Sequence, residues 1–272
     1  MRHTLGFVVF TLPWMFCSTS ARADVMVSTS LDLTAFQVVP TVGTFVIVSP
    51  FTASANAQAQ DDVSAPDSQF TQVNDGSTSA GAATAFANAS ASASALTAIT
   101  LAASAASSVH IPGVPFFGSS TGQGGLGGDF GGTGLFEILD SSNPTPSPVD
   151  VTFKATLSGT QSLSADGAGV FATSEIIFNL LLPDLGAVPI FLDNPISIGP
   201  SSSLDSPYSN TLMGTVTMLT NTDYTLIAEV DAESSALNSV PEPSFLFHTE
   251  VGIFAILLAG RSWRNKKLRK TA

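Results

Sequence analysis

Apolar and polar residues alternate along several stretches of the chain, which is the pattern of a β-strand with one buried face. In Val149–Leu157 the odd-numbered residues are apolar and the even-numbered residues are polar. Gly169–Leu182 continues this pattern over a longer run, and its expected core-facing residues are Ala172, Ile176, Phe178 and Leu180. The β-branched stretches Val25–Leu33 and Val38–Val48, separated at Pro40, predict further strands.

Two more alternating runs, Leu212–Leu219 and Tyr224–Ala232, flank the polar segment Thr220–Asp223 and predict a β-hairpin. The residues of the second run expected to face the core are Tyr224, Leu226, Ala228, Val230 and Ala232. Those expected to face mainly water are Thr225, Glu229 and Asp231.

An Ala/Ser-rich region covers Gly81–Ser108, and within it Ser90–Ala95 alternates with a period of two. Alanine favours a helix, but serine, threonine and asparagine weaken that preference, and no helical stripe of apolar residues is present. A long flat strand or hairpin is therefore favoured, with a helix as the alternative. Its small side chains would allow sheets or partner chains to approach closely.

Glycine and proline mark one long interruption of these patterns. Phe116–Gly134 is glycine-rich, and Asn143–Pro148 contains three prolines. Neither half of the chain on its own has an obviously sufficient core. The sequence therefore predicts an all-β fold, a β-sandwich of antiparallel strands that spans residues 24–239 as one domain, with a Gly/Pro-rich loop at residues 112–148.

The first 23 residues have the organisation of a secretory signal peptide. A charged start is followed by the apolar run Leu5–Phe16 and by small residues, with Ala21 and Ala23 in an A-x-A pattern. We expect cleavage after Ala23, so that the mature chain begins at Asp24. Cys17, the single cysteine, would leave with the signal peptide, and the mature chain would have no disulfide or thiol chemistry.

The last 33 residues have three parts. Pro241 and Pro243 cannot donate to a sheet, so Val240–Ser244 is expected to be an exposed, protease-accessible peptide. Residues 245–260 are mostly apolar, although His248 and Glu250 interrupt the run, and are expected to form a membrane helix. Residues 261–272 carry six cations, Arg261, Arg264, Lys266, Lys267, Arg269 and Lys270, which act as a stop-transfer signal. The alternative is a buried C-terminal helix of a soluble protein.

The order of these parts, Pro241-Glu242-Pro243, an apolar run and an Arg/Lys end, resembles the PEP-CTERM sorting signal of Gram-negative bacteria. The resemblance covers residues 240–272. It implies transient anchoring in the inner membrane, processing by an exosortase-type enzyme, and transfer to the cell surface or the exopolysaccharide matrix. It leaves open what the folded part does there.

Residues 24–239 are strongly acidic, because 19 of the 21 acidic residues lie there and Lys154 is their only Lys or Arg. Such a charge repels phosphate backbones, so no nucleic-acid partner is expected. His110 is the only histidine of this region and is expected to be a packed loop residue. With one histidine and no cysteine, too few of the preferred zinc ligands are present, and no metal site or cofactor is predicted.

Three motif matches in the glycine-rich stretch carry little weight. Gly122–Gly127 fits G-x-G-x-x-G without the strand and helix that a dinucleotide site needs. Gly118–Gly122 fits G-x-S-x-G, but no histidine follows it before the tail. Gly124–Asp129 matches part of one calcium-binding nonapeptide, which normally occurs in arrays.

The sequence therefore favours a secreted, non-enzymatic surface or matrix protein with no catalytic residues. One alternative is a module that binds polysaccharide or calcium. Another is a glycosidase that uses two carboxylates, although no pair stands out in the sequence.

Overall fold

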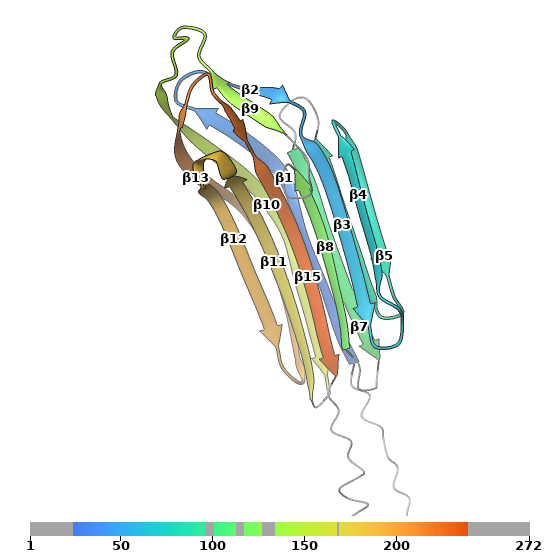
Figure 1. Ribbon diagram of the computed structural model, residues 1–272. Helices are drawn as coiled ribbons and strands as arrows, with labels where there is room; N and C mark the ends of the chain where they lie inside the picture. The colour runs from blue at the N-terminus through green and yellow to red at the C-terminus, as the bar shows by residue number, and fades with distance from the viewer. Residues whose placement is uncertain (1–23, 96–100, 113–116, 127–133, 168, 239–272) are drawn as a thin grey trace, which may run out of the picture.

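Long antiparallel strands make up most of residues 24–95, 101–112, 117–126, 134–167 and 169–238, the part of the chain that the computed structural model describes (Figure 1). The first strands are β1 (Asp24–Pro40), β2 (Thr44–Ser49), β3 (Thr52–Asp61), β4 (Asp67–Asn74), β5 (Ser77–Ala83), β6 (Ala87–Ala95), β7 (Leu101–Pro112) and β8 (Phe117–Leu126). They are followed by β9 (Leu135–Leu139), β10 (Pro148–Asp166), β11 (Val170–Leu182), β12 (Ala187–Ile198), β13 (Ser202–Leu219), β14 (Asp223–Thr225) and β15 (Ile227–Asn238). These described residues contain no α-helix, only the 3₁₀ turn η2 (Pro183–Leu185).

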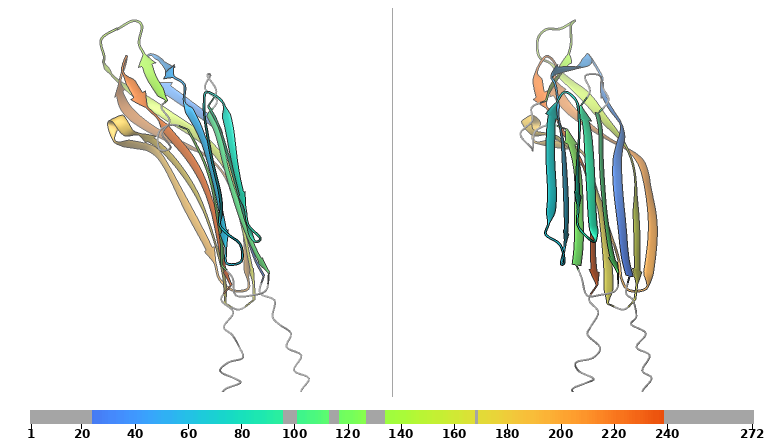
Figure 2. Two further views of the ribbon diagram at one scale, coloured as in Figure 1. Left: turned by 45° about the vertical axis from the view of Figure 1, so that its right-hand side comes forward. Right: turned by 90° about the vertical axis from the view of Figure 1, so that its right-hand side faces the viewer.

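Two six-stranded sheets lie face to face in an elongated, sandwich-like arrangement (Figure 2). The β1 sheet has the strand order β13-β10-β1-β7-β6-β5, and the β15 sheet has the order β12-β11-β15-β8-β3-β4. A small third sheet, β14-β9-β2, lies at one end. The pairs within each sheet are antiparallel, for example β1 with β10 and β11 with β15. The predicted all-β class with antiparallel sheets is therefore confirmed.

The buried core has two parts of different character. One cluster is rich in large side chains and includes Phe136, Phe153 and Phe178, all fully buried. The other is built mainly from alanines of β3, β5 and β6, together with Val25 and Ile111. Because alanine and valine are small, the sheets can lie closer together around the second cluster.

The alternating runs take the faces that their patterns predict. In β10, Val149, Val151, Phe153, Ala155 and Leu157 are all buried. The predicted core-facing residues of β11 and of the 224–232 run are likewise buried. The described residues of the Ala/Ser region form the end of β5, the strand β6 and most of β7, so for them the strand prediction is confirmed over its helical alternative.

The predicted Gly/Pro-rich loop at residues 112–148 is wrong over residues 117–126 and 135–139. Phe117–Leu126 forms β8, an inner strand between β15 and β3, and Leu135–Leu139 forms β9. Gly118 and Gly122 face the opposite sheet. A Cβ on Gly122 would lie 2.4 Å from the carbonyl oxygen of Ser90 and 2.6 Å from that of Ala106. Glycine is needed here for close packing between sheets, which a reading of glycine as a loop former misses.

The predicted hairpin of residues 212–232 is also wrong. β13 pairs with β10 in the β1 sheet, whereas β15 lies between β11 and β8 in the β15 sheet. The intervening residues turn at Asn221, which has a φ of 51°, and pass through β14 in the small sheet. Local alternation identified both strands, but long-range pairing chose their partners.

A buried carboxylate connects two turns at one end of the sandwich. Asp61 is 5% exposed, and its Oδ1 accepts hydrogen bonds from the N–H groups of Val63 and Ser64 at 2.9 and 2.6 Å. Its Oδ2 accepts from the N–H of Phe86 at 2.9 Å. Desolvation raises the pKa of Asp61, but hydrogen bonds from Thr84, Phe86, Ser64 and Val63 outweigh it and lower the pKa to about 2.

We expect Asp61→Ala to lower the free energy of unfolding by about 2–3 kcal/mol at pH 7, because three backbone donors lose a charged acceptor. The folded pKa lies below the unfolded value of 3.8, so this stabilisation is present above about pH 4 and is lost as the pH falls towards 2. Urea unfolding at pH 7 and pH 2.5 measures both effects. An equal loss at the two pH values would show that the carboxylate charge has no part in it.

Candidate functional site

Acidic side chains gather on the outer face of the β15 sheet, over three neighbouring strands. On β15 they are Glu229, Asp231 and Glu233; β11 contributes Glu175 and β12 contributes Asp193. Glu175 lies directly opposite Glu233, and Asp193 lies opposite Ile177, which in turn lies opposite Asp231. We call these five residues the acidic face.

The sequence places them there through strict alternation. Ala228, Val230 and Ala232 point into the core and are almost completely buried. Their neighbours Glu229, Asp231 and Glu233 must then point outward, because successive side chains of a strand take opposite faces. Ile176 and Ser174, both buried, orient Glu175 in the same way.

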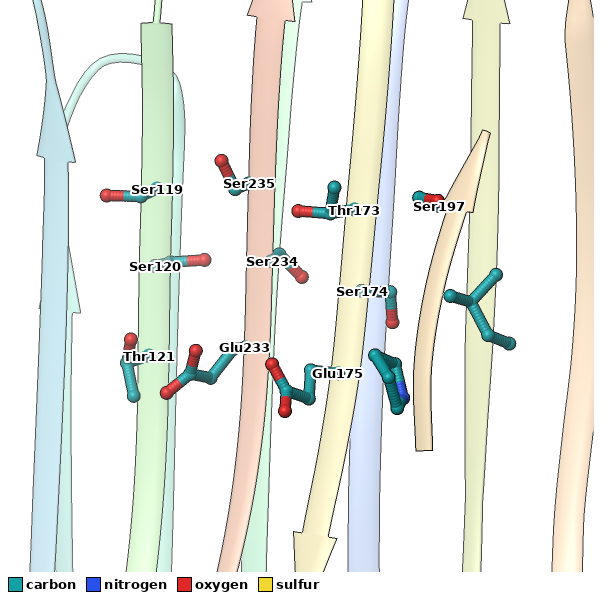
Figure 3. A pocket seen from close by; sticks show the side chains of 12 residues that line it. Ser119, Ser120, Thr121, Thr173, Ser174, Glu175, Ser197, Glu233, Ser234 and Ser235 are labelled. Atoms are coloured by element: carbon teal, nitrogen blue, oxygen red, sulfur yellow. The ribbon is translucent and has the colours of Figure 1, made fainter. Parts of the chain in front are cut away.

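A pocket of about 460 Å³ opens on this face and is lined by residues of β8, β15, β11 and β12. Figure 3 shows Thr121, Glu233 and Glu175 side by side at one level of the sheet. Ser119, Ser235 and Thr173 form the next level, towards the end of β15. The pocket therefore presents two carboxylates beside a row of hydroxyl groups.

Asp231 differs from its neighbours because it is only 9% exposed. Its Oδ1 atom is buried and has no hydrogen-bond partner, while Gln123 hydrogen-bonds the side chain. Burial is the largest cause of a pKa raised to about 8, and the negative charges of Glu229, Glu233 and Glu175 add to it. The folded protein thus holds this proton at neutral pH.

Glu175 and Asp193 hydrogen-bond to each other through their carboxyl groups. The pKa of Glu175 is raised by desolvation first, and then by this contact and by the charges of Asp193 and Glu233.

A buried polar network fixes the strands behind the pocket. The Thr29 hydroxyl lies 2.6 Å from that of Ser174 and 2.8 Å from that of Ser234, and it donates to the carbonyl of Glu233 at 3.0 Å. Gln161 donates through Nε2 to the carbonyls of Ser174 and Asn194 at 3.2 and 2.9 Å. These bonds connect the β1 sheet to the strands that carry Glu175 and Glu233, which keeps the pocket floor in place.

The processing and anchoring residues predicted from the sequence all lie outside the described residues. They are Ala21 and Ala23, the motif Val240–Ser244, and the six cations from Arg261 to Lys270. Asp129 of the partial nonapeptide lies outside them as well. Gly118–Gly122 belongs to β8 and not to a turn between a strand and a helix, as the G-x-S-x-G chemistry would need.

The sequence reasoning missed Asp231, which was expected to face mainly water. It does lie on the outer face, but Gln123 and Ile177 on the adjoining strands flank it. Three acids at alternate positions of one strand, Glu229, Asp231 and Glu233, were the signal that could have indicated an acidic site. His110 lies on β7 and not in a loop, and its Nε2 is 2.9 Å from Oδ1 of Asp24.

Among the described residues, no group of three or more His, Cys, Asp or Glu side chains is arranged to hold a metal ion. The same residues include no helix of the length and apolarity needed to cross a membrane. No protein-family model matches the chain, and neither the curated proteins nor the solved structures include a significant match to it.

Proposed function

We propose that the chain is an exported, non-enzymatic protein of the cell surface or exopolysaccharide matrix, sorted through its C-terminal tail. The observation that carries this proposal is the three-part tail: the Pro-Glu-Pro motif at 241–243, the apolar run 245–260 and the basic end 261–272. An exosortase-type enzyme would recognise the tail while residues 245–260 hold the protein transiently in the inner membrane.

The described strands are compatible with this proposal. β1 spans Asp24–Pro40 and β15 spans Ile227–Asn238, so both lie between the proposed cleavage after Ala23 and the motif Val240–Ser244. Removal of either signal would therefore take away no residue of these strands.

The start of β1 and the end of β15 lie at the same end of the sandwich. Asp24 pairs with Asp166 at the end of β10, and Asn238 pairs with Val170 at the start of β11, four residues later (Figure 1). An anchor that follows Asn238 would hold this end near the membrane. The small sheet, at the opposite end, would then point outward with the acidic sandwich between them.

The sorting proposal predicts a defined mature species. The wild-type protein should have the intact mass of a chain that starts at Asp24 and ends near Val240–Ser244, and it should be found outside the cell. Replacing both prolines, Pro241→Ala with Pro243→Ala, should leave the uncut chain in the inner membrane, because the processing enzyme loses its motif. Intact-mass spectrometry of the membrane and extracellular fractions of the producing cells measures this.

A matched control is Pro144→Ala with Pro146→Ala, which removes two prolines from the 143–148 turn region and leaves the tail unchanged. This variant should be processed like the wild type. Full-length protein in the inner membrane for the wild type and both variants would overturn the sorting proposal.

A further inference from the structure

We propose that the free edge of β5 is a strand-addition surface that fits a second copy of this chain, and that side chains of β4 keep it closed in the folded protein. β5 is the last strand of the β1 sheet, and β4 is the last strand of the β15 sheet. An edge strand presents N–H and C=O groups to any other chain that approaches it. The proposal concerns this edge alone and does not rest on the sorting proposal.

Backbone N–H groups on this edge of β5 are bound by β4 side chains. The two strands lie side by side at one side of the sandwich (Figure 1). The N–H of Gly81 donates to Oε1 of Gln69 at 2.7 Å, and the N–H of Ala83 donates to Oδ2 of Asp67 at 2.9 Å. These N–H groups point away from β6, because alternate residues of an antiparallel strand direct their backbone groups to opposite sides.

The same contact continues along β4 in one regular register. The hydroxyl of Thr71 donates to the carbonyl of Ser79 at 2.8 Å. The bonding residues of β4 therefore follow one another at every second position, and so do their partners on β5, in the opposite direction. β4 takes the place of a neighbouring strand, but with side chains and not with its backbone. We call Asp67, Gln69 and Thr71 the edge cap.

β5 itself lacks the usual protection of an edge strand. Residues 77–83 include no charged residue and no proline, which are the common means of blocking an edge. The edge strands at the other side of the sandwich do contain prolines: β12 has Pro189 and Pro195, and β13 has Pro207. Proline has no N–H group to offer a further strand. The edge of β5 therefore depends on its cap.

The partner that fits this edge is the β5 strand of a second copy. Two antiparallel copies of one strand are self-complementary, because the donors of each can face the acceptors of the other. The chain as a whole is strongly acidic, but residues 77–83 are small and uncharged. Two copies can therefore meet here without placing like charges opposite each other, which would destabilise the pair.

The test removes the edge cap from the chain purified from its producing cells, in the triple variant Asp67→Ala, Gln69→Ala and Thr71→Val. In sedimentation velocity over a wide range of concentrations, the wild type should remain a monomer and the triple variant should form a dimer as the concentration rises. An open β5 edge has backbone donors and acceptors with no partner other than water, and a second copy supplies them.

Hydrogen exchange measured by NMR locates the contact. In the dilute, monomeric triple variant, the amides of Gly81 and Ala83 should exchange about ten-fold faster than in the wild type, the factor that corresponds to one hydrogen bond of ordinary net strength. In the concentrated variant they should be protected again, because backbone carbonyls of the second copy accept from them.

Two controls separate the cap from other effects of substitution. Asp67→Asn removes the charge but keeps an oxygen acceptor, so it should remain a monomer. Ser68→Ala with Gln72→Ala changes the opposite face of β4 and should also remain a monomer. Unchanged circular dichroism shows that each variant folds. If the triple variant does not fold, Gln69→Ala alone gives the same comparison at the amide of Gly81.

Three results would overturn the proposal: a triple variant that is monomeric at every concentration, a dimer in which the amides of Gly81 and Ala83 still exchange fast, or the same dimer formed by Asp67→Asn. The second result would place the contact on another surface, and the third would mean that the lost charge causes the association. None of these results bears on the mass or location of the mature protein, which test the sorting proposal.

Discussion

Asp231→Asn is expected to stabilise the folded protein, and the gain should grow from near zero at pH 4 to on the order of 5 kcal/mol at pH 8. The side chain is buried, and its pKa is raised from 3.8 to about 8 by desolvation and by the charges of Glu229, Glu233 and Glu175. Asparagine has almost the same shape as the protonated acid but has no charge to desolvate.

The direction in which stability changes with pH follows from the number of protons that each state binds. Between pH 4 and pH 8 the unfolded chain has lost the Asp231 proton, whereas the folded protein still holds it. The folded state therefore binds more protons in this window, and the free energy of unfolding falls as the pH rises. The variant should lose most of this slope. A smaller slope should remain, since the pKa of Glu175 is also raised.

Urea unfolding of the wild type and the variant at pH 4, 6 and 8 measures the effect. Asp205→Asn is the matched control, because it removes one carboxylate from the exposed face of the β1 sheet and should leave the slope unchanged. If the wild type and Asp231→Asn show the same change in stability from pH 4 to pH 8, Asp231 is ionised in the folded protein and its assigned state is wrong.

Gly122→Ala should destabilise the protein by about 3 kcal/mol or more. The added methyl group would lie 2.4 Å from the Ser90 carbonyl oxygen, 2.6 Å from that of Ala106 and 3.0 Å from the Ala106 nitrogen. All three are backbone atoms of β6 and β7, which cannot rotate away as a flexible side chain could. The two sheets would have to separate, and the alanine cluster between them would lose contact.

Gly81→Ala provides the comparison. Gly81 is an exposed strand residue of β5, and an added Cβ there meets only the Ala89 carbonyl oxygen at 3.9 Å. Alanine at this position should be neutral or slightly stabilising, because it reduces the freedom of the unfolded chain. Thermal unfolding of the two variants beside the wild type tests the pair. Similar melting temperatures for both variants would show that the sheets tolerate a side chain at Gly122.

The location and the buried face of individual β-strands followed from the sequence alone. The all-β class, the strands within 149–157 and 169–182, and the buried faces of β10, β11 and β15 were predicted correctly. These features depend on alternation within one segment, which a strand expresses directly as two faces. The same reasoning recognised the alanine face of β6, where period two remains visible despite the small side chains.

Pairing between distant segments could only be seen in the tertiary structure. β13 and β15 are neighbours in sequence but belong to different sheets, because β10 pairs with β13 while β11 and β8 hold β15. The glycines of β8 allow this strand to pack closely against β6 and β7 of the opposite sheet. The local sequence pattern does not show this contact, because the two sides of it lie far apart along the chain.

The acidic face also depends on pairing between segments that are distant in the sequence. The sequence shows Glu229, Asp231 and Glu233 at alternate positions, but Glu175 lies more than fifty residues earlier and joins them only through the pairing of β11 with β15. The proton held by Asp231 depends on that pairing too, since the side chains around it come from three strands. By itself the sequence determined which residues of each strand face outward. It also predicted a signal peptide at residues 1–23 and a sorting signal at residues 240–272. The tertiary structure decided which outward residues meet, because charge, burial and hydrogen bonding depend on distances across strands and not on positions along one.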